Sequence, residues 1–184
     1  MSQKQEIILS GIRPTGRLHY GNYFGAVKTF LDLQEKGHRC YYFIADYHAL
    51  TTISERVDFY RQTIDMLRTY VACGLDPEKS VIYRQSDLPC TAELGLLLGM
   101  ITNIGFLERG TTYKDKMGKL AANANVEGNP LSFGLLGYPV LMASDILIVR
   151  ANLVPVGDDQ RQHVEMAMDI ARKFNSRFGE TLTI

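Results

Sequence analysis

The sequence predicts an α/β fold in which a mostly parallel β-sheet is flanked by helices, as in Rossmann-like domains. Three short apolar or β-branched runs, at 7–9, 40–46 and 80–84, are typical of buried strands, and each precedes a segment with apolar residues at helical spacing. Strands that alternate with helices of this length indicate parallel strands joined by helical crossovers. With 184 residues and a hydrophobic fraction of 46%, we expect one domain spanning 1–184.

The first half of the chain divides into three strand–helix units. The first unit runs from the strand 7–9 through a glycine-rich loop to a helix that Asn22 is expected to cap and Gly37 to end. In the second unit the strand 40–46 precedes a helix that begins near Val57 and ends at Gly74. The third unit pairs the strand 80–84 with a helix over 92–103.

The second half is less regular. The periodicity weakens between Gly105 and Gly137, which predicts a loop-rich helical insertion within the domain. A helix is expected over 138–149, with Pro139 at its first position because proline lacks the N–H that a first turn leaves unpaired. The run NLVPVG, 152–157, predicts a short strand, and the segment 158–174 predicts a helix with two carboxylates near its N-terminus, where the helix dipole favours them.

Composition excludes several classes of protein. Twenty basic and twenty acidic residues give zero formal net charge, which is not the pattern of a dedicated nucleic-acid or membrane-surface binder. The three cysteines form no CxxC pair, which argues against a disulfide framework and a cysteine-ligated zinc site. Asp159 and His163 have metal-ligand spacing, but two ligands are too few, so no metal site is expected. Without a signal peptide or an 18-residue apolar run, a cytoplasmic protein is expected, with no membrane contact.

The loop GRLHYGNYFGA, 16–26, lies where a ligand site is expected. In open parallel sheets, ligands bind beyond the carboxyl ends of the strands. Gly21 has no Cβ, so a base or a phosphate could approach its backbone, and His19 and Asn22 could add side-chain donors. The glycine spacing matches neither GxGxxG nor the P-loop, so spacing alone leaves both a nucleotide site and an ordinary turn open.

Three longer segments resemble one enzyme family. In this order, SGIRPTGRLHYGNYFGA, GYPVLMASDIL and VPVGDDQRQHVE are similar to the catalytic domain of tryptophanyl-tRNA synthetases, which are class I aminoacyl-tRNA synthetases. The resemblance extends from about Ile8 to Thr183. It implies ATP-dependent activation of L-tryptophan to tryptophanyl-adenylate for transfer to tRNA(Trp), with Mg²⁺ accompanying ATP, in a homodimer.

The resemblance also implies the ATP-binding residues. His19-Tyr20-Gly21-Asn22 matches the His-Ile-Gly-His-type signature of the family, which gives His19 and Asn22 catalytic roles near the phosphates. Arg13 stands where the family often has glutamine. The ribose is expected against the start of the last helix. The full set of implied ATP-binding residues is Arg13, Pro14, Thr15, Gly21, Asn22, Gly157, Asp158 and Asp159.

The spacing of Tyr138, Met142 and Asp145 places these residues on one helix face, where they can converge on one pocket. A buried carboxylate needs a donor, and an indole N–H can only donate, so Asp145 is expected to bind the tryptophan indole. The alternative is that Asp145 caps a helix or pairs with a lysine or arginine. By resemblance, Tyr138 and Gln160 hold the α-amino group, and the pocket is completed by Leu9, His48, Val154 and Val156.

The family's second signature, Lys-Met-Ser-Lys-Ser, is implied to follow Ile184, before a helical anticodon-binding domain. The run KDKMGK, 114–119, precedes Asp145 and is interpreted as a charged surface segment. We therefore expect a chain truncated before the second signature and poorly active alone. Two alternatives stay open: a tyrosine-specific relative of the same fold, since aspartate can also accept from a phenol, and a non-catalytic module for ligand binding or dimerisation.

Overall fold

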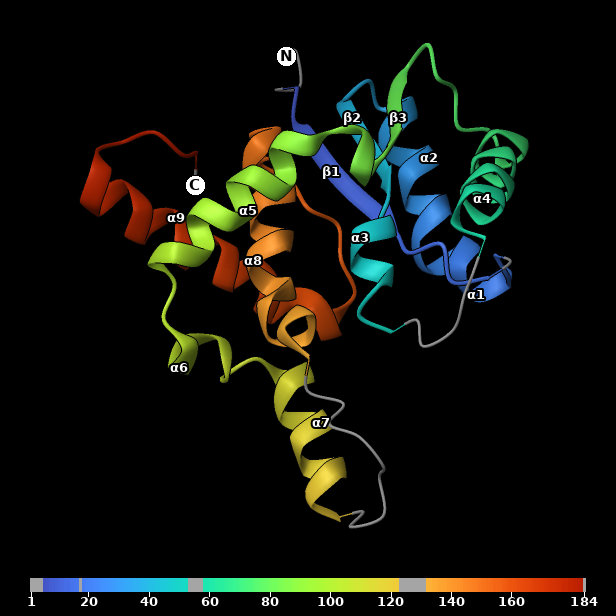
Figure 1. Cartoon of the computed structure of the whole chain (residues 1–184). Helices are drawn as coiled ribbons and strands as arrows, with labels where there is room; N and C mark the ends of the chain where they lie inside the picture. Colours follow the sequence, from blue (N-terminus) through green and yellow to red (C-terminus); the bar gives the residue numbers. More distant parts are fainter. Residues whose placement is uncertain (1–4, 17, 53–57, 123–131, 184) are drawn as a thin grey trace.

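The computed structural model describes residues 5–16, 18–52, 58–122 and 132–183 (Figure 1). Within these ranges, the three strands β1 (Ile7–Ile12), β2 (Arg39–Ile44) and β3 (Ser80–Arg84) form one parallel sheet in the order β1-β2-β3. The predicted parallel sheet flanked by helices is confirmed. The strand β3 has the predicted bounds, whereas β1 continues beyond Leu9 and β2 ends before Asp46.

Helices connect the strands and form most of the second half of the chain. They are α1 (Tyr20–Asn22), which continues through a π-helical segment (Tyr23–Val27) into α2 (Lys28–Glu35), then α3 (Asp46–Ala49), α4 (Phe59–Cys73), α5 (Pro89–Ile101), α6 (Ile104–Leu107), α7 (Thr111–Ala122), α8 (Phe133–Ile148) and α9 (Arg161–Phe178). Two single 3₁₀ turns complete the set, η2 (Gln85–Asp87) and η3 (Asp158–Gln160). The predicted start of the second helix, near Val57, lies outside the described residues.

The strands β1 and β2 contribute buried residues to both faces of the sheet, which explains their apolar runs, whereas β3 is less buried and exposes Val81. Successive strand residues point to opposite faces. Ile8 and Tyr42 pack with α2 and α4, and the buried Tyr42 hydroxyl donates to the carbonyl of Phe30 at 2.8 Å. Leu9 and Phe43 belong to the other core, which they share with α5, α8 and α9 (Figure 1). Two layers of helices therefore hold the sheet between them.

The region 105–137 is more helical than the sequence predicts. The helices α6 and α7 occupy its first part, and α8 already begins at Phe133. The Ser132 side chain caps α8 by accepting from the N–H of Leu135 at 3.1 Å. Pro139 is buried inside α8, so its predicted place at the first helical position is wrong. Packing of α8 against α5 and α9 outweighs the missing proline N–H; residues 123–131 of the region lie outside the described ranges.

The segment 152–157 is not the predicted strand. It makes one isolated parallel bridge, between Leu153 and Ile8, and Leu9 donates its backbone N–H to the Leu153 carbonyl at 3.2 Å. Pro155 has no N–H to continue a ladder. The segment nevertheless runs beside β1, because the Asn152 side chain also accepts from the N–H of Ile7 at 2.8 Å.

The start of the first helix also differs from its prediction. His19, and not Asn22, is the N-cap residue, because the His19 Nδ1 accepts from the N–H of Gly21 at 3.1 Å. Asn22 is the third residue of α1, and its Oδ1 accepts from the N–H of the N-cap residue His19 at 3.1 Å. The two side chains thus satisfy donors that a helix start leaves unpaired.

Candidate functional site

The predicted site residues gather at the carboxyl ends of the strands. There β1 leads into the loop that contains Arg13 and His19, β2 leads into α3 with His48, and β3 leads into η2 with Gln85. The segment 152–155 runs parallel to β1 and contacts it from Ile7 to Ser10, so the chain reaches Gly157 while running toward the same edge. The loop after β1, α3 and η2 therefore lie at the edge where a parallel α/β sheet is expected to bind ligands.

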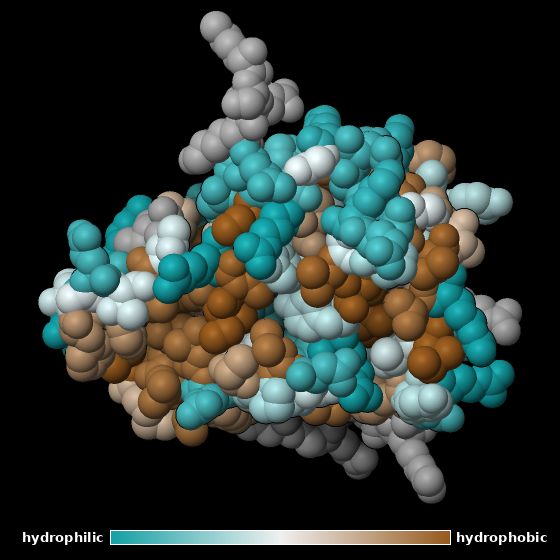
Figure 2. Space-filling model, turned by 90° about the horizontal axis from the view of Figure 1, so that it is seen from above, coloured by the Kyte–Doolittle hydropathy of each residue, from teal (hydrophilic) through white to brown (hydrophobic). Residues whose placement is uncertain are grey.

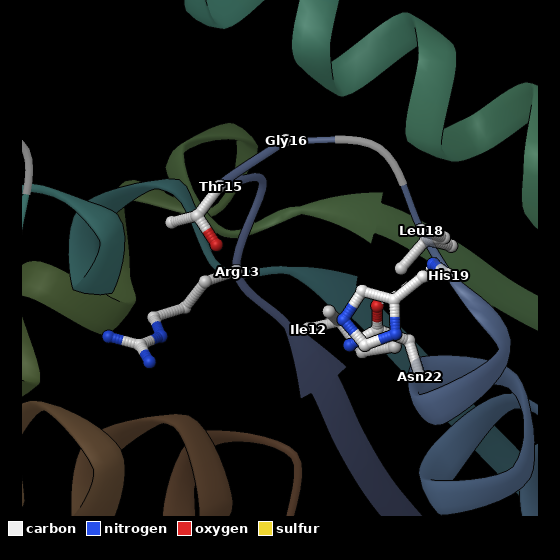
Figure 3. A pocket seen from close by; sticks show the side chains of 7 residues that line it. All are labelled: Ile12, Arg13, Thr15, Gly16, Leu18, His19 and Asn22. Carbon is white, nitrogen blue, oxygen red and sulfur yellow. Dashed lines mark hydrogen bonds between the residues drawn. The ribbon is translucent and has the colours of Figure 1, made fainter.

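A small pocket of about 180 Å³ lies in the loop after β1. Figure 3 shows the side chains of His19 and Asn22 on one side of this pocket and those of Arg13 and Thr15 on the other. The remaining lining residues are Ile12, Gly16 and Leu18. Three of the predicted ATP-binding residues, Arg13, Thr15 and Asn22, thus share one hollow with His19, whereas Pro14 and Gly21 lie outside its lining.

The N–H of Gly21 is not free for an anion. It already donates to His19 Nδ1, so a neutral His19 ring carries its hydrogen on Nε2, where it can act as a donor. A Cβ at Gly21 would lie 2.9 Å from His19 Cε1 and 3.0 Å from Nδ1. Gly21 therefore permits the position of the His19 imidazole, whereas the sequence alone suggested close approach of a ligand to its backbone.

A second hollow of about 400 Å³ lies against the segment 154–158 and the first turns of α9. It combines four predicted site residues with others that the sequence did not indicate; its lining is Val154, Pro155, Val156, Gly157, Asp158, Arg161, Val164 and Glu165. Next to it, Gln160 donates to the Asp159 carboxylate at 2.8 Å. Among the described residues, no three metal-ligating His, Cys, Asp or Glu side chains gather.

Asp145 is a buried carboxylate on α8, with an exposed fraction of 2%. The Gln85 amide donates to its Oδ1 at 2.9 Å and its Oδ2 at 3.0 Å, and the His48 Nε2 lies 2.9 Å from Oδ2. Because an ionised carboxylate only accepts, the His48 Nε2 is the donor. The alternative that Asp145 pairs with a lysine or arginine is wrong. Burial raises the pKa of Asp145, although the bonds from His48 and Gln85 act in the opposite direction.

Gln85 and His163 contact the predicted site residues Asp145 and Tyr138, but the sequence analysis did not assign Gln85 and considered His163 only as a metal ligand. Gln85 is 1% exposed, and its Oε1 accepts from the backbone N–H of Tyr47 at 3.1 Å. Its place directly after a predicted parallel strand was the available signal. His163 is 0% exposed, and its Nε2 is hydrogen-bonded to the Tyr138 hydroxyl. Burial lowers the pKa of His163, so the ring is neutral at pH 7.

Tyr138 and Asp145 are linked through His48. The Tyr138 ring makes an edge contact with His48, with ring centroids 6.3 Å apart, and His48 donates to Asp145. The predicted tryptophan-binding residues differ in exposure: Leu9 is almost fully buried in the core, Met142 is partly buried against the same core, and Val156 is exposed. The structure therefore connects Tyr138, His48 and Asp145, whereas Leu9 belongs to the apolar core.

The comparisons with known proteins identify the family. The family model for class I tRNA synthetases of the tryptophan and tyrosine type (W and Y) matches residues 1–184. The chain belongs to this family. Curated relatives of this class I synthetase include a tryptophan–tRNA ligase of Fusobacterium nucleatum, 52% identical over 171 residues, which are 93% of this chain and 50% of the relative. Another is the tryptophan–tRNA ligase of Clostridium acetobutylicum, 45% identical, with 100% of this chain and 53% of the relative matched.

Solved structures of class I synthetases share this fold. The tryptophanyl-tRNA synthetase of Campylobacter jejuni, in complex with ADP and tryptophan, superposes with a TM-score of 0.84 at 44% identity, over 96% of this chain and 53% of that one. A tyrosyl-tRNA synthetase of Archaeoglobus fulgidus has a TM-score of 0.69 at 22% identity, which shows common fold alone. The chain spans about half the length of the curated relatives that it matches.

Proposed function

We propose that this chain is the part of a tryptophanyl-tRNA synthetase that binds ATP and L-tryptophan and joins them into tryptophanyl-adenylate. The observation that supports this most is Asp145, a buried carboxylate held by hydrogen bonds from Gln85 and His48. A carboxylate offers about four acceptor sites, and the three contacts of Asp145 leave room for one donor more. An indole N–H is a donor only, and the low exposure of the site strengthens such a bond.

The other parts of tryptophan are assigned to the residues around Asp145. Tyr138 and Gln160 bind the α-amino group, and Met142 packs on the indole ring. The walls of the pocket are supplied by Leu9, His48, Val154 and Val156. The identity with relatives named tryptophan–tRNA ligases supports the choice of tryptophan over tyrosine.

ATP is assigned to the loop after β1, with the phosphates near His19 and Asn22, and with Arg13, Pro14, Thr15 and Gly21 around the nucleotide. Gly157, Asp158 and Asp159 face the ribose. In the reaction, a carboxylate oxygen of tryptophan attacks the α-phosphorus, a new O–P bond forms, and the bond to the bridging oxygen breaks. That oxygen keeps the electron pair and leaves as part of pyrophosphate.

This transfer depends on orientation and on stabilising charge, not on a covalent enzyme intermediate. The chain supplies the His19 Nε2–H, the Asn22 amide and the Arg13 guanidinium on the walls of the pocket. Mg²⁺ is proposed to enter with the phosphates, its usual mode of binding to nucleotides, and to neutralise part of their charge.

The partners and the location follow from the same proposal. The adenylate is consumed by tRNA(Trp), and the protein acts in the cytoplasm. We also propose a homodimer, because α5 exposes Leu96, Leu97 and Met100 at 60%, 55% and 74%, and Figure 2 shows a broad apolar area on one part of the surface. Large exposed apolar patches usually mark protein contacts. In the described ranges, no helix is both long and apolar enough to cross a bilayer.

Calorimetric titration of L-tryptophan and L-tyrosine tests the proposal. We expect tighter binding of tryptophan, and a loss of about 1–3 kcal/mol of its binding free energy in Asp145→Ala, as for a buried group that loses its partner. Asp169→Ala is the matched control, because Asp169 is exposed and bonds only to Arg172 in the next turn. Equal or tighter binding of tyrosine would favour the tyrosine-specific alternative. Binding of ATP and tryptophan without tryptophan-dependent pyrophosphate exchange would favour the non-catalytic one.

A further inference from the structure

His163 is a buried polar side chain that the proposed chemistry does not use. It lies in the first turn of α9 with an exposed fraction of 0%. Its Nε2 is bonded to the Tyr138 hydroxyl on α8, and its Nδ1 has no hydrogen-bond partner within the described ranges. A buried polar atom without a partner costs stability. His163 therefore stabilises the core less than an apolar residue of its size would. What an apolar residue could not provide is the hydrogen bond to Tyr138.

Tyr138 belongs to a connected row of side chains that runs from His163 to Asp145. Its ring contacts two histidines, with centroids 4.9 Å from His163 and 6.3 Å from His48, and His48 donates to Asp145. Tyr138 and Asp145 are seven residues apart, about 10 Å along the helix axis. An amino acid whose ring end is bound at Asp145 therefore extends its other end toward Tyr138.

We propose that His163 is a positioning residue of the tryptophan site, which fixes the Tyr138 hydroxyl where the α-ammonium group of the amino acid binds. This inference rests on the proposed function. A phenol hydroxyl has one donor hydrogen and two acceptor lone pairs, and its hydrogen rotates unless a partner holds it. The bond to His163 fixes one of these directions and so helps to orient the hydroxyl. Because His163 itself is fully buried, it acts through Tyr138 and not by touching the substrate.

A double-mutant cycle with two ligands tests this role. The variants are His163→Leu, which removes the bond to Tyr138, His163→Gln, which can restore a polar group near the position of Nε2, and Tyr138→Phe, alone and combined with His163→Leu. The ligands are L-tryptophan and indole-3-propionate, which keeps the ring and the carboxylate but lacks the amine. Binding is measured by calorimetry on the whole chain, with circular dichroism as the test of folding and Met166→Leu as a buried control in α9.

We expect His163→Leu to weaken L-tryptophan binding about tenfold, the effect of losing one hydrogen bond to a charged group. His163→Gln should recover part of this loss, indole-3-propionate should bind unchanged, and the loss should vanish in the Tyr138→Phe background. An equal loss for both ligands, or an undiminished loss beside Tyr138→Phe, would overturn the inference, because His163 would then act only through the core. If His163→Leu does not fold, His163→Gln and Tyr138→Phe are compared in the same way: each should weaken L-tryptophan binding and leave indole-3-propionate binding unchanged. A parent chain that binds no tryptophan would overturn the proposed function itself.

Discussion

The Gln85 side-chain amide donates to both carboxylate oxygens of Asp145, at 2.9 and 3.0 Å, although the two residues are 60 positions apart in the chain. The same side chain accepts from the backbone N–H groups of Tyr47 and His48. One buried amide, directly after β3, thus joins the start of α3 and the last turn of α8. The acceptor oxygens of Asp145 are positioned by this amide and by the His48 ring, and no lysine or arginine among the described residues pairs with them.

Gln85→Met is expected to weaken tryptophan binding and to destabilise the fold by about 1–3 kcal/mol, because Asp145 would lose two of its three hydrogen bonds and the N–H of Tyr47 would lose an acceptor. Chemical denaturation gives the free energy of unfolding and calorimetry gives the affinity.

Gln34→Met is the matched control for this change. Gln34 is also a buried glutamine, but it bonds to Gly74, Asp76 and Ser80 on the other side of the sheet. Gln34→Met should lower the free energy of unfolding and leave the tryptophan affinity unchanged. If both variants bind tryptophan as the parent chain does, Gln85 does not shape the site.

Gly21→Ala is expected to weaken ATP binding and leave tryptophan binding unchanged. The added Cβ would lie 2.9 Å from the His19 ring, so the imidazole that accepts from the Gly21 N–H must move. Gly25→Ala is the control, because a Cβ there meets no described atom within 4 Å. Nucleotide titration of the three proteins measures the effect; equal ATP affinities would place the nucleotide away from His19.

The sequence predicts the sheet well because β1 and β2 contribute buried apolar residues to both of its faces. A continuous apolar run such as CYYFIAD indicates a buried strand even when the neighbouring strand is unknown. The order of strands and helices then follows from the chain connectivity. The need of Asp145 for donors follows from its place in an apolar helix, and Gln85 and His48 supply them. The loop of His19 follows β1 at the carboxyl edge of the sheet, as the strand–helix alternation predicts; its role in ligand binding stays a prediction.

The rest depends on tertiary contacts that one sequence does not show. Gln85 is an ordinary residue until the fold places it 2.9 Å from Asp145, and His163 is an isolated histidine until α9 packs against Tyr138. Pro139 was misplaced because local rules favour proline at a helix start, whereas packing against α5 and α9 extends the helix on its N-terminal side. The segment around Pro155 has strand-like composition but makes only one bridge.

Acid is expected to destabilise the chain partly through His163. Burial lowers the pKa of His163 below its ordinary value of about 6.5, so at pH values between the lowered pKa and about 6.5 the unfolded chain binds more protons than the folded one. In this window the free energy of unfolding increases as the pH rises and decreases as the pH falls, because His163 must be protonated on unfolding. Asp145 acts in the opposite sense above its ordinary pKa of about 3.9, because burial raises its pKa and ionisation then costs stability.

Urea denaturation of the parent chain and of His163→Leu at several pH values between about 5 and 7.5 separates the two effects. The histidine variant should lose less stability on acidification than the parent, even if it is less stable at neutral pH. Identical slopes of unfolding free energy against pH would show that His163 is not the group that binds the proton.

A charge on the exposed face of α5 is expected to convert the proposed dimer into a monomer. Met100→Lys and Leu97→Lys change side chains that are 74% and 55% exposed, so they should disturb no core. Val71→Lys on α4 is the control, because Val71 is 49% exposed and α4 packs on the opposite face of the sheet from α5. Sedimentation velocity measures the mass in solution. A dimer that survives both α5 changes and dissociates in Val71→Lys would place the contact on the other side.

The last prediction concerns rate. The transition state of adenylate formation places charge on the departing pyrophosphate, and the resemblance assigns part of its stabilisation to lysines of the second signature, in the half of the relatives that this chain does not match. A fusion of residues 1–184 to that half of the Fusobacterium nucleatum protein should therefore exchange pyrophosphate faster than residues 1–184 alone, by a factor on the order of 100 to 1,000 for each donor gained. Tryptophan affinity should change little, because Asp145 and its partners lie within 1–184, and tRNA charging should be measurable only in the fusion. The comparison requires both proteins at equal active-site concentration, counted by tryptophan titration. Similar exchange rates in the two would show that His19, Asn22 and Arg13, together with the metal bound to ATP, supply the stabilising charge without the second signature.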